Sequence, residues 1–146
     1  MAEFRRGALI LDLYYAGELG TTLLARELAK EGIPMELLGL LTEIARVGPL
    51  TPSQLSELTG LPPATLYDRV ERLAGDGLVG RERNPADGRS TLIRVTPAGR
   101  TRVHRAGPAV RRAVLALMGH LDRPLEDVER GVFELREALT ATLVRS

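Results

Sequence analysis

The sequence predicts a mainly α-helical fold with a small β-hairpin, organised as a winged helix-turn-helix between terminal helices. Three features of the stretch from Leu50 to Thr96 support this prediction. Two short amphipathic segments are joined by a tight apolar turn. A pair of alternating segments follows, which is typical of a hairpin. The hairpin ends in a turn at residues 84–89, Asn-Pro-Ala-Asp-Gly-Arg, and forms the wing.

The composition narrows the class of protein. A chain of 146 residues is the size of about one domain and is long enough to bury a core. Cysteine is absent, which excludes disulfides, thiolate metal sites and cysteine redox sensing. No apolar run approaches the roughly 18 residues of a membrane span, and no signal-peptide pattern opens the chain. We therefore expect a cytoplasmic protein without a membrane partner.

Two helices are predicted before the helix-turn-helix. Residues 8–30 carry two adjacent apolar stripes at helical spacing, which indicates a helix with a wide buried face. Gly32 then supplies a stop signal and Pro34 a start signal. The next helix is expected from about Met35 to Val47, where the Gly-Pro pair at residues 48–49 ends it.

The helix-turn-helix begins with a strong local signal. Thr51 is a good N-cap, and Gln54 three residues later completes a pattern close to a capping box. The first helix is expected over residues 52–59, and the second from Pro62 or Pro63 to about Ala74. In the second helix three apolar residues pack inward: Leu66, Val70 and Leu73. Its outward residues are then Ala64, Thr65, Tyr67, Asp68, Arg69 and Arg72.

The wing and two further helices complete the predicted chain. Residues 78–83 and 90–95 alternate as two strands. Thr96 is expected to cap a long helix that Pro108 kinks. Asp122 is expected to cap the last helix, whose apolar residues keep three-four spacing. No internal repeat or low-complexity linker is visible.

The charge is concentrated in the middle of the chain. Residues 68–112 hold 11 arginines and 5 acidic residues, although the whole chain has a formal net charge of only +1. The local field decides what a surface attracts, so this segment is predicted to face an anionic partner such as double-stranded DNA. Arginine suits phosphates and base edges, but a preference for arginine over lysine can equally reflect a GC-rich genome.

The terminal helices predict a homodimer. Both helices carry continuous apolar stripes, and a chain of this length has few other residues that could cover them. Two-fold dimers are the commonest oligomers, so a second copy is the simplest cover. The alternative is that the first and last helices cover each other within one chain. We assign residues 1–33 and 108–146 to dimerisation and residues 34–107 to a DNA-binding domain.

The whole chain resembles the multiple-antibiotic-resistance regulator (MarR) family. The most specific segment is residues 87–99, Asp-Gly-Arg-Ser-Thr-Leu-Ile-Arg-Val-Thr-Pro-Ala-Gly, which is similar to the family's wing signature. Residues 73–79, Leu-Ala-Gly-Asp-Gly-Leu-Val, resemble its usual exit from the recognition helix. The resemblance implies a winged helix-turn-helix that binds DNA.

Seven residues are candidates for DNA contact: Thr65, Arg69, Arg72, Arg83, Asp87, Arg89 and Arg94. Thr65 corresponds to a family position that meets DNA. Arg89 on the tight turn can enter a narrow minor groove, and Asp87 can hold that side chain, although another arginine is an alternative partner. For Arg69 and Arg72 the competing interpretation is an ordinary solvated charge, and for the wing it is a solvated turn with an incidental Asp-x-Arg pattern.

Asp68 departs from the family pattern, in which a basic residue is common. We expect it to pair with Arg72 four residues later. The alternative is that it accepts a hydrogen bond from cytosine.

The resemblance also implies control by a small aromatic or lipophilic effector between the dimerisation helices and the DNA-binding domain. Six residues are candidates to line such a pocket, with ordinary core packing as the alternative: Tyr14, Tyr15, Met35, Leu38, Thr42 and Arg46. No cofactor is expected, and His104 and His120 lie too far apart in sequence to predict a zinc site.

The sequence therefore predicts a homodimeric, sequence-specific DNA-binding regulator, most simply a repressor that an effector releases from a pseudo-palindromic operator. The alternative is a winged-helix module that docks protein partners. An enzyme is rejected, because the chain offers no phosphate loop, no paired-carboxylate motif and no cysteine nucleophile.

Overall fold

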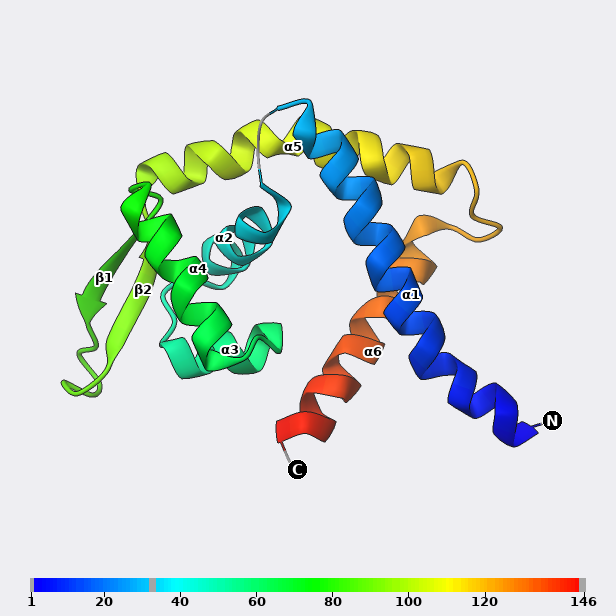
Figure 1. Ribbon diagram of the computed structural model, residues 1–146, viewed down its shortest axis with the longest axis horizontal. Coiled ribbons are helices and arrows are strands. Elements are labelled where there is room, and N and C mark those ends of the chain that lie inside the picture. The colour runs from blue at the N-terminus through cyan, green and yellow to red at the C-terminus, as the bar shows by residue number, and fades with distance from the viewer. Residues whose placement is uncertain (1, 32–33, 145–146) are drawn as a thin grey trace.

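The chain folds into a compact lobe and a pair of projecting terminal helices joined by one long helix (Figure 1). The computed structural model describes residues 2–31 and 34–144, with side chains from residue 7 onward. The elements are α1 (Ala2–Ala29), α2 (Met35–Val47), α3 (Pro52–Thr59), α4 (Pro63–Gly75), β1 (Val79–Arg83), β2 (Thr91–Val95), α5 (Pro97–Met118) and α6 (Leu125–Val144). This architecture confirms the predicted fold class. No helix in the described ranges combines the length and apolarity that crossing a membrane requires.

The lobe is held together by one apolar core between α2, α3, α4 and the hairpin. Leu41, Ile44, Leu55, Leu73 and Ile93 are almost fully buried in it. Strands β1 and β2 are antiparallel, with Val79 opposite Val95 at the base of the wing. The segment between α2 and α3 joins the sheet, because Leu50 and Ile93 exchange backbone hydrogen bonds of 3.2 and 2.8 Å. The base of the wing is therefore fixed to the core.

Local capping sets where the lobe helices begin. The Gln54 amide donates to Thr51 Oγ1 at 3.2 Å, and the Thr51 amide donates to Gln54 Oε1 at 2.9 Å, so the predicted capping box is present. Thr96 caps α5 in the same way through the amide of Gly99 at 3.1 Å. At Gly99 a β-carbon would collide with the Leu78 carbonyl oxygen, so glycine lets the first turn of α5 lie against the start of the wing.

A second, smaller core joins α1, α2 and α5. Leu28, Leu38, Ala106 and Ala109 are buried there. The small alanines let the helices approach closely. Helix α5 continues through Pro108 and forms a shallow arch in Figure 1. The same helix thus carries the wing at one end and the terminal helices at the other.

The second core carries a buried carboxylate at its edge. Glu27 is only 7% exposed and accepts hydrogen bonds from Lys30 Nζ at 2.7 Å and from Arg112 Nε at 3.0 Å. Arg112 also donates to Glu31 at 3.1 Å. These hydrogen bonds from Lys30 and Arg112 hold the pKa of Glu27 below its ordinary value near 4.5, against the opposing effect of burial. The cluster ties the end of α1 to α5.

This cluster predicts a pH-dependent contribution to stability. The pKa of Glu27 is lowered on folding, so its stabilisation is complete above the ordinary pKa of 4.5 and is lost as the pH falls through the lowered value. We expect the Tm difference between the unaltered protein and Glu27→Gln to be largest near neutral pH and to shrink on acidification. Thermal unfolding followed by circular dichroism measures it, with the exposed Glu18→Gln on the same helix as a control. A difference independent of pH would contradict this role.

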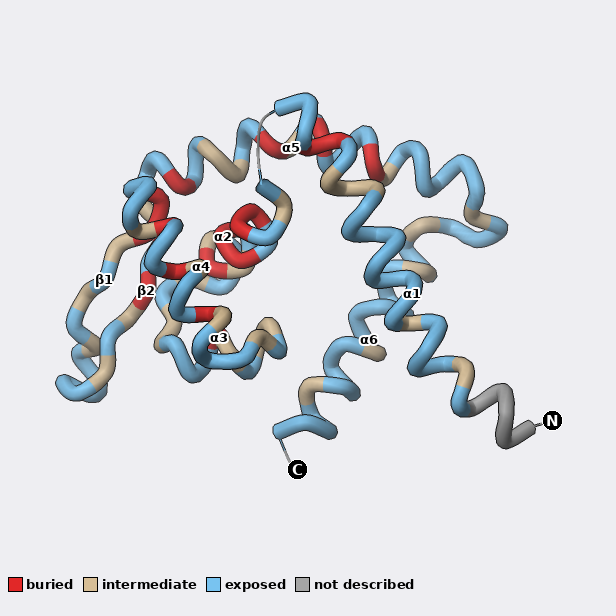
Figure 2. The backbone as a smooth tube through the Cα atoms, in the orientation of Figure 1, coloured by how far each residue is buried: buried red, intermediate tan, exposed pale blue. Residues whose placement is uncertain are grey.

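The terminal helices leave their apolar side chains uncovered within one chain. The buried residues in Figure 2 lie in the lobe, in α5 and at the C-terminal end of α1, whereas α6 has no buried residue in its described part. The large apolar side chains exposed on the terminal helices are Leu9, Ile10, Leu11, Tyr14, Tyr15, Leu19, Val132, Phe133, Leu139, Leu143 and Val144. These side chains are exposed, so α1 and α6 do not cover each other's apolar stripes in the way the alternative requires.

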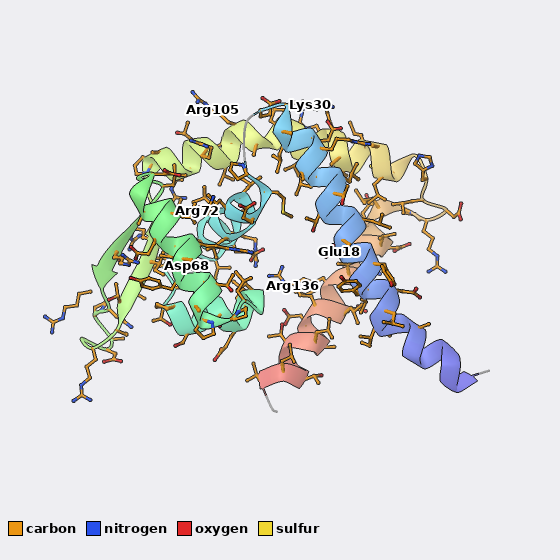
Figure 3. The ribbon with its side chains drawn as sticks, viewed as in Figure 1. Glu18, Lys30, Asp68, Arg72, Arg105 and Arg136 are labelled. Carbon is orange, nitrogen blue, oxygen red and sulfur yellow. The ribbon has the colours of Figure 1, made fainter. Side chains whose placement is uncertain are left out.

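Helix α6 reaches the lobe through Arg136, which Figure 3 labels between α6 and the lobe. Its guanidinium donates to Glu43 Oε1 at 3.4 Å and to the Leu58 carbonyl at 3.3 Å. Burial alone would raise the pKa of Glu43, but hydrogen bonds from Arg46 and Arg136 outweigh it and lower that pKa.

Two predictions about helix ends differ from the structure. The first helix begins at Ala2 rather than near Ala8. The last helix begins at Leu125, so Asp122 is not its N-cap. The physical reason is Pro124: the residue before a proline is disfavoured in the helical conformation, so Arg123 cannot belong to the first turn. The Pro124 carbonyl instead accepts from the amides of Asp127 and Val128. Gly32, the predicted stop signal, lies outside the described residues.

Candidate nucleic-acid interface

Helix α4 presents a polar face away from the core. Leu66, Val70 and Leu73 are buried, as predicted. At 3.6 residues per turn, the positions directly opposite this buried stripe are Ala64 and Asp68. Tyr67, Asp68 and Arg72 are exposed, whereas Thr65 and Arg69 are half-buried. Arg69 lies on the side of α4 toward α2, where it lines a cavity of about 290 Å³ together with Glu36 and Arg136.

Three arginines near this face are held by carboxylates of the same chain. Arg72 Nη1 lies 3.4 Å from Glu36 Oε1 on α2. Arg81 on β1 pairs with Glu71 on α4. Arg94 on β2 binds Glu82 on β1 with both Nε, at 3.0 Å, and Nη2, at 2.6 Å. The pairs are solvent-exposed, and such pairs contribute at most about 1 kcal/mol, so phosphates can replace the carboxylates.

The pair between Arg94 and Glu82 follows from the register of the hairpin. Glu82 lies opposite Leu92, and Arg94 is the diagonal neighbour on the same face of the sheet. The hydrogen bonds from Arg94 hold the pKa of Glu82 below its ordinary value and raise the pKa of the guanidinium. Both groups therefore stay charged, and the pair links β2 to β1.

The tip of the wing is a rigid turn. Asn84 Oδ1 accepts from the Ala86 amide at 3.0 Å, and the Asn84 amide group donates to Ser90 Oγ at 2.8 Å. Asp87 Oδ1 accepts from the backbone amide of Arg89 at 3.1 Å. Asp87 thus fixes the main chain of Arg89 rather than its side chain, which corrects the predicted contact. Within residues 7–31 and 34–144, no ion pair holds the Arg89 guanidinium, which stands exposed at the tip.

Arg83 lies against the same turn. A β-carbon at Gly88 would come within 2.7 Å of Arg83 Nη2, so the absence of a side chain at this position lets the guanidinium lie on the backbone of the turn. Long side chains extend from the tip of the wing in Figure 3. The turn therefore presents Arg83 and Arg89 on a fixed support.

The candidate DNA contacts lie on two neighbouring elements. Thr65, Arg69 and Arg72 are on α4, and Arg83, Asp87, Arg89 and Arg94 are on the hairpin. A cavity of about 440 Å³ separates the two elements; its lining includes Tyr67 and Glu71 from α4, Arg81 and Thr91 from the hairpin, and Ser53 from α3. The expected pair between Asp68 and Arg72 is not formed, because Arg72 turns to Glu36. The sequence pattern did not predict the carboxylate partners of these arginines, which are Glu36, Glu71 and Glu82.

The six candidate effector residues do not converge in one chain. Tyr14 and Tyr15 are each 61% exposed on α1 and contact each other edge to face, with ring centroids 5.2 Å apart. Leu38 is buried in the second core. Met35 borders the cavity beside Arg136. Thr42 and Arg46 line a different cavity, of about 320 Å³, between α2 and α5.

Comparison with known proteins identifies the chain's relatives. Residues 31–90 match the sequence profile of the MarR family. The uncharacterised HTH-type transcriptional regulator YdgJ of Bacillus subtilis (strain 168) is 33% identical over 72 residues, which span 49% of this chain and 44% of YdgJ. The match therefore covers less than half of that relative.

Solved structures share the fold. A mutant of MarR from E. coli, complexed with operator DNA, superposes with a TM-score of 0.75 at 22% identity, covering 90% of this chain and 94% of the other. BpsR of Bordetella bronchiseptica superposes with a TM-score of 0.71 at 24% identity, covering 86% of this chain and 89% of BpsR. That structure comes from a study of how 6-hydroxynicotinic acid regulates the DNA binding of BpsR. The family profile, the sequence relative and the shared fold agree: residues 31–90 match the MarR family of transcriptional regulators, and the chain has the winged helix-turn-helix fold of the MarR structures.

Proposed function

We propose that this protein is a homodimeric transcriptional regulator that binds specific sequences of double-stranded DNA. The observation that carries the proposal is the arginine-rich surface formed by α4 and the wing. Exposed ion pairs, whose carboxylates phosphates can replace, hold Arg72, Arg81 and Arg94 there. Arg89 stands exposed on a rigid turn. Such a surface attracts phosphates, and the MarR structure with operator DNA shares its fold.

In the proposed complex, α4 enters the major groove and the wing follows the backbone. Thr65 lies in the first turn of α4, where phosphates are favoured by the helix terminus. Arg69 and Arg72 contact bases or phosphates, and Arg83 and Arg94 contact phosphates. Arg89 enters the minor groove, where the negative potential is strongest, while Asp87 keeps the turn in shape.

A dimer places two such lobes on one duplex. We assign residues 1–33 and 108–146 to dimerisation and residues 34–107 to DNA binding; the uncovered apolar side chains of α1 and α6 support this division. Two-fold symmetry with recognition helices about 34–36 Å apart corresponds to one turn of B-DNA and to a pseudo-palindromic operator.

We further propose that the protein is a repressor that a small aromatic or lipophilic effector releases. The cavity between α2 and α5 supports an anionic effector, because Arg46, Arg100 and His104 line it together with Thr42. The 6-hydroxynicotinic acid of the BpsR study is an aromatic acid of this kind. The other four candidates line the effector site only if the partner subunit or a movement of the lobe brings them to this cavity: Tyr14, Tyr15, Met35 and Leu38.

The salt dependence of DNA binding tests the proposal. If each lobe neutralises three or four phosphates, the logarithm of the association constant should fall with the logarithm of salt concentration with a slope of about −5 to −7. Fluorescence anisotropy with fragments selected from the source genome measures the slope. Repeating the titration with benzoate at constant ionic strength tests effector release.

The competing function, docking of a protein partner, predicts a different result. A chain that associates with duplexes only weakly, with no preference among sequences, would contradict specific DNA binding. Affinity that does not change with salt would contradict it as well, because released counterions are an unavoidable product of phosphate contact.

A further inference from the structure

An acidic residue occupies the centre of the outward face of α4. Asp68 is exposed and lies opposite the stripe formed by Leu66, Val70 and Leu73. Figure 3 labels Asp68 and Arg72 along this helix. On a helix that enters the major groove, the residue at this position faces the base edges most directly.

Three glutamates near this face have arginine partners, and Asp68 has none among the described residues. Glu36 receives Arg72, Glu71 receives Arg81, and Glu82 receives Arg94. Within α4, side chains three and four residues away are the ones that can meet Asp68. Of these only Arg72 is cationic, and it turns to Glu36.

Helix stability does not account for the acid either. Asp68 is the sixth residue of α4, which begins at Pro63. The favourable interaction of a carboxylate with the helix dipole falls off within the first turn. An unpaired carboxylate beside a phosphate backbone is also repelled, so the docked complex must supply a hydrogen-bond donor to it.

Base edges in the major groove offer two such donors, the amino groups of cytosine and adenine. Adenine places its acceptor N7 next to the amino group, and the paired thymine adds another acceptor, so a carboxylate meets repulsion on both sides. Cytosine has a carbon-bound hydrogen on one side of its amino group and an acceptor only on the paired guanine. Helical side chains lean toward the N-terminus, so Asp68 overlies Ala64 and Thr65, whose small side chains leave room for a base.

We propose that Asp68 is a specificity-determining residue that accepts a hydrogen bond from the amino group of one cytosine in each half-site. The inference rests on the proposed DNA-binding function and assigns a base to it. It also gives Asp68 a second effect: the carboxylate weakens binding to duplexes that lack the cytosine, because it is then left unpaired near phosphates.

The test compares the base preferences of three proteins: the unaltered chain, Asp68→Asn, and Asp76→Asn. Asp76 lies at the C-terminal end of α4, so its replacement changes the charge equally without altering the outward face. Selection from randomised duplexes followed by sequencing gives the preference at every position. The unaltered chain and Asp76→Asn should share one position per half-site at which cytosine is preferred by about tenfold or more.

In Asp68→Asn that preference should be lost and adenine should gain, because an amide can bind adenine with both its oxygen and its nitrogen. Affinity for unrelated duplexes should rise. If Asp68→Asn selects the same motif as the unaltered chain, the assignment of Asp68 is wrong while the proposed function stands. If the unaltered chain selects no motif at all, the proposed function fails and the assignment fails with it.

Discussion

Replacing Arg89 with alanine is expected to weaken operator binding by about 100-fold. A hydrogen bond to a charged group contributes about 1.5–3 kcal/mol, and each dimer carries two wings. The turn holds the backbone of Arg89 through Asp87, so little order is lost elsewhere when the exposed side chain is removed. Fluorescence anisotropy at fixed ionic strength measures the change.

The matched control is Arg130→Ala. Arg130 is another exposed arginine, held by Asp127 on α6 at 3.3 Å, and it lies on an element that is not proposed to meet DNA. Both variants remove one positive charge, so a general loss of electrostatic attraction would affect them equally. Equal affinities for Arg89→Ala and the unaltered protein would remove the wing tip from the mechanism.

Val132→Asp is expected to raise the dimer dissociation constant by about 1,000-fold or more. Val132 is 61% exposed in the single chain and shares a face of α6 with Leu139 and Leu143, which are also exposed. An unpaired charge buried at an interface costs about 3–5 kcal/mol, and a two-fold interface contains it twice. Sedimentation equilibrium measures the constant.

A carboxylate on the opposite face of α6 provides the control. Arg130→Asp should leave the dimer intact, because residue 130 lies away from the apolar stripe. Circular dichroism should show the same helix content in both variants, since Val132 has few neighbours within its own chain. A dimer that survives Val132→Asp would place the interface on another surface.

The bounds of the lobe helices were predictable because their signals are local. Helices α2 and α3 have the predicted bounds, since Pro34, Gly48 and the capping box at Thr51 act within a few residues of the helix ends. The strands were predicted to within one residue at each end. The start of α6 was also encoded locally, in Pro124, but an acid at residue 122 resembled a cap more strongly.

The ion pairs between residues far apart in the sequence were not predictable in the same way. Arg72 and Glu36 are 36 positions apart, and Arg112 and Glu27 are 85 apart, so only the packing of helices brings them together. The local pattern favoured a pair between Asp68 and Arg72. Packing placed Glu36 within reach of the same arginine, and the tertiary contact replaced the local one. The DNA-contact residues themselves stay predictions.

Helix α5 acts as a lever. Its 22 residues span about 33 Å, with the wing junction near one end and the Glu27 cluster past its midpoint. A rotation of about 5° over that length displaces the far end by roughly 3 Å, comparable to a hydrogen-bond length. A small change in packing where Ala106 and Ala109 meet Leu28 is therefore magnified at the wing. Conservative substitutions at this contact can change the half-site spacing that the two lobes span.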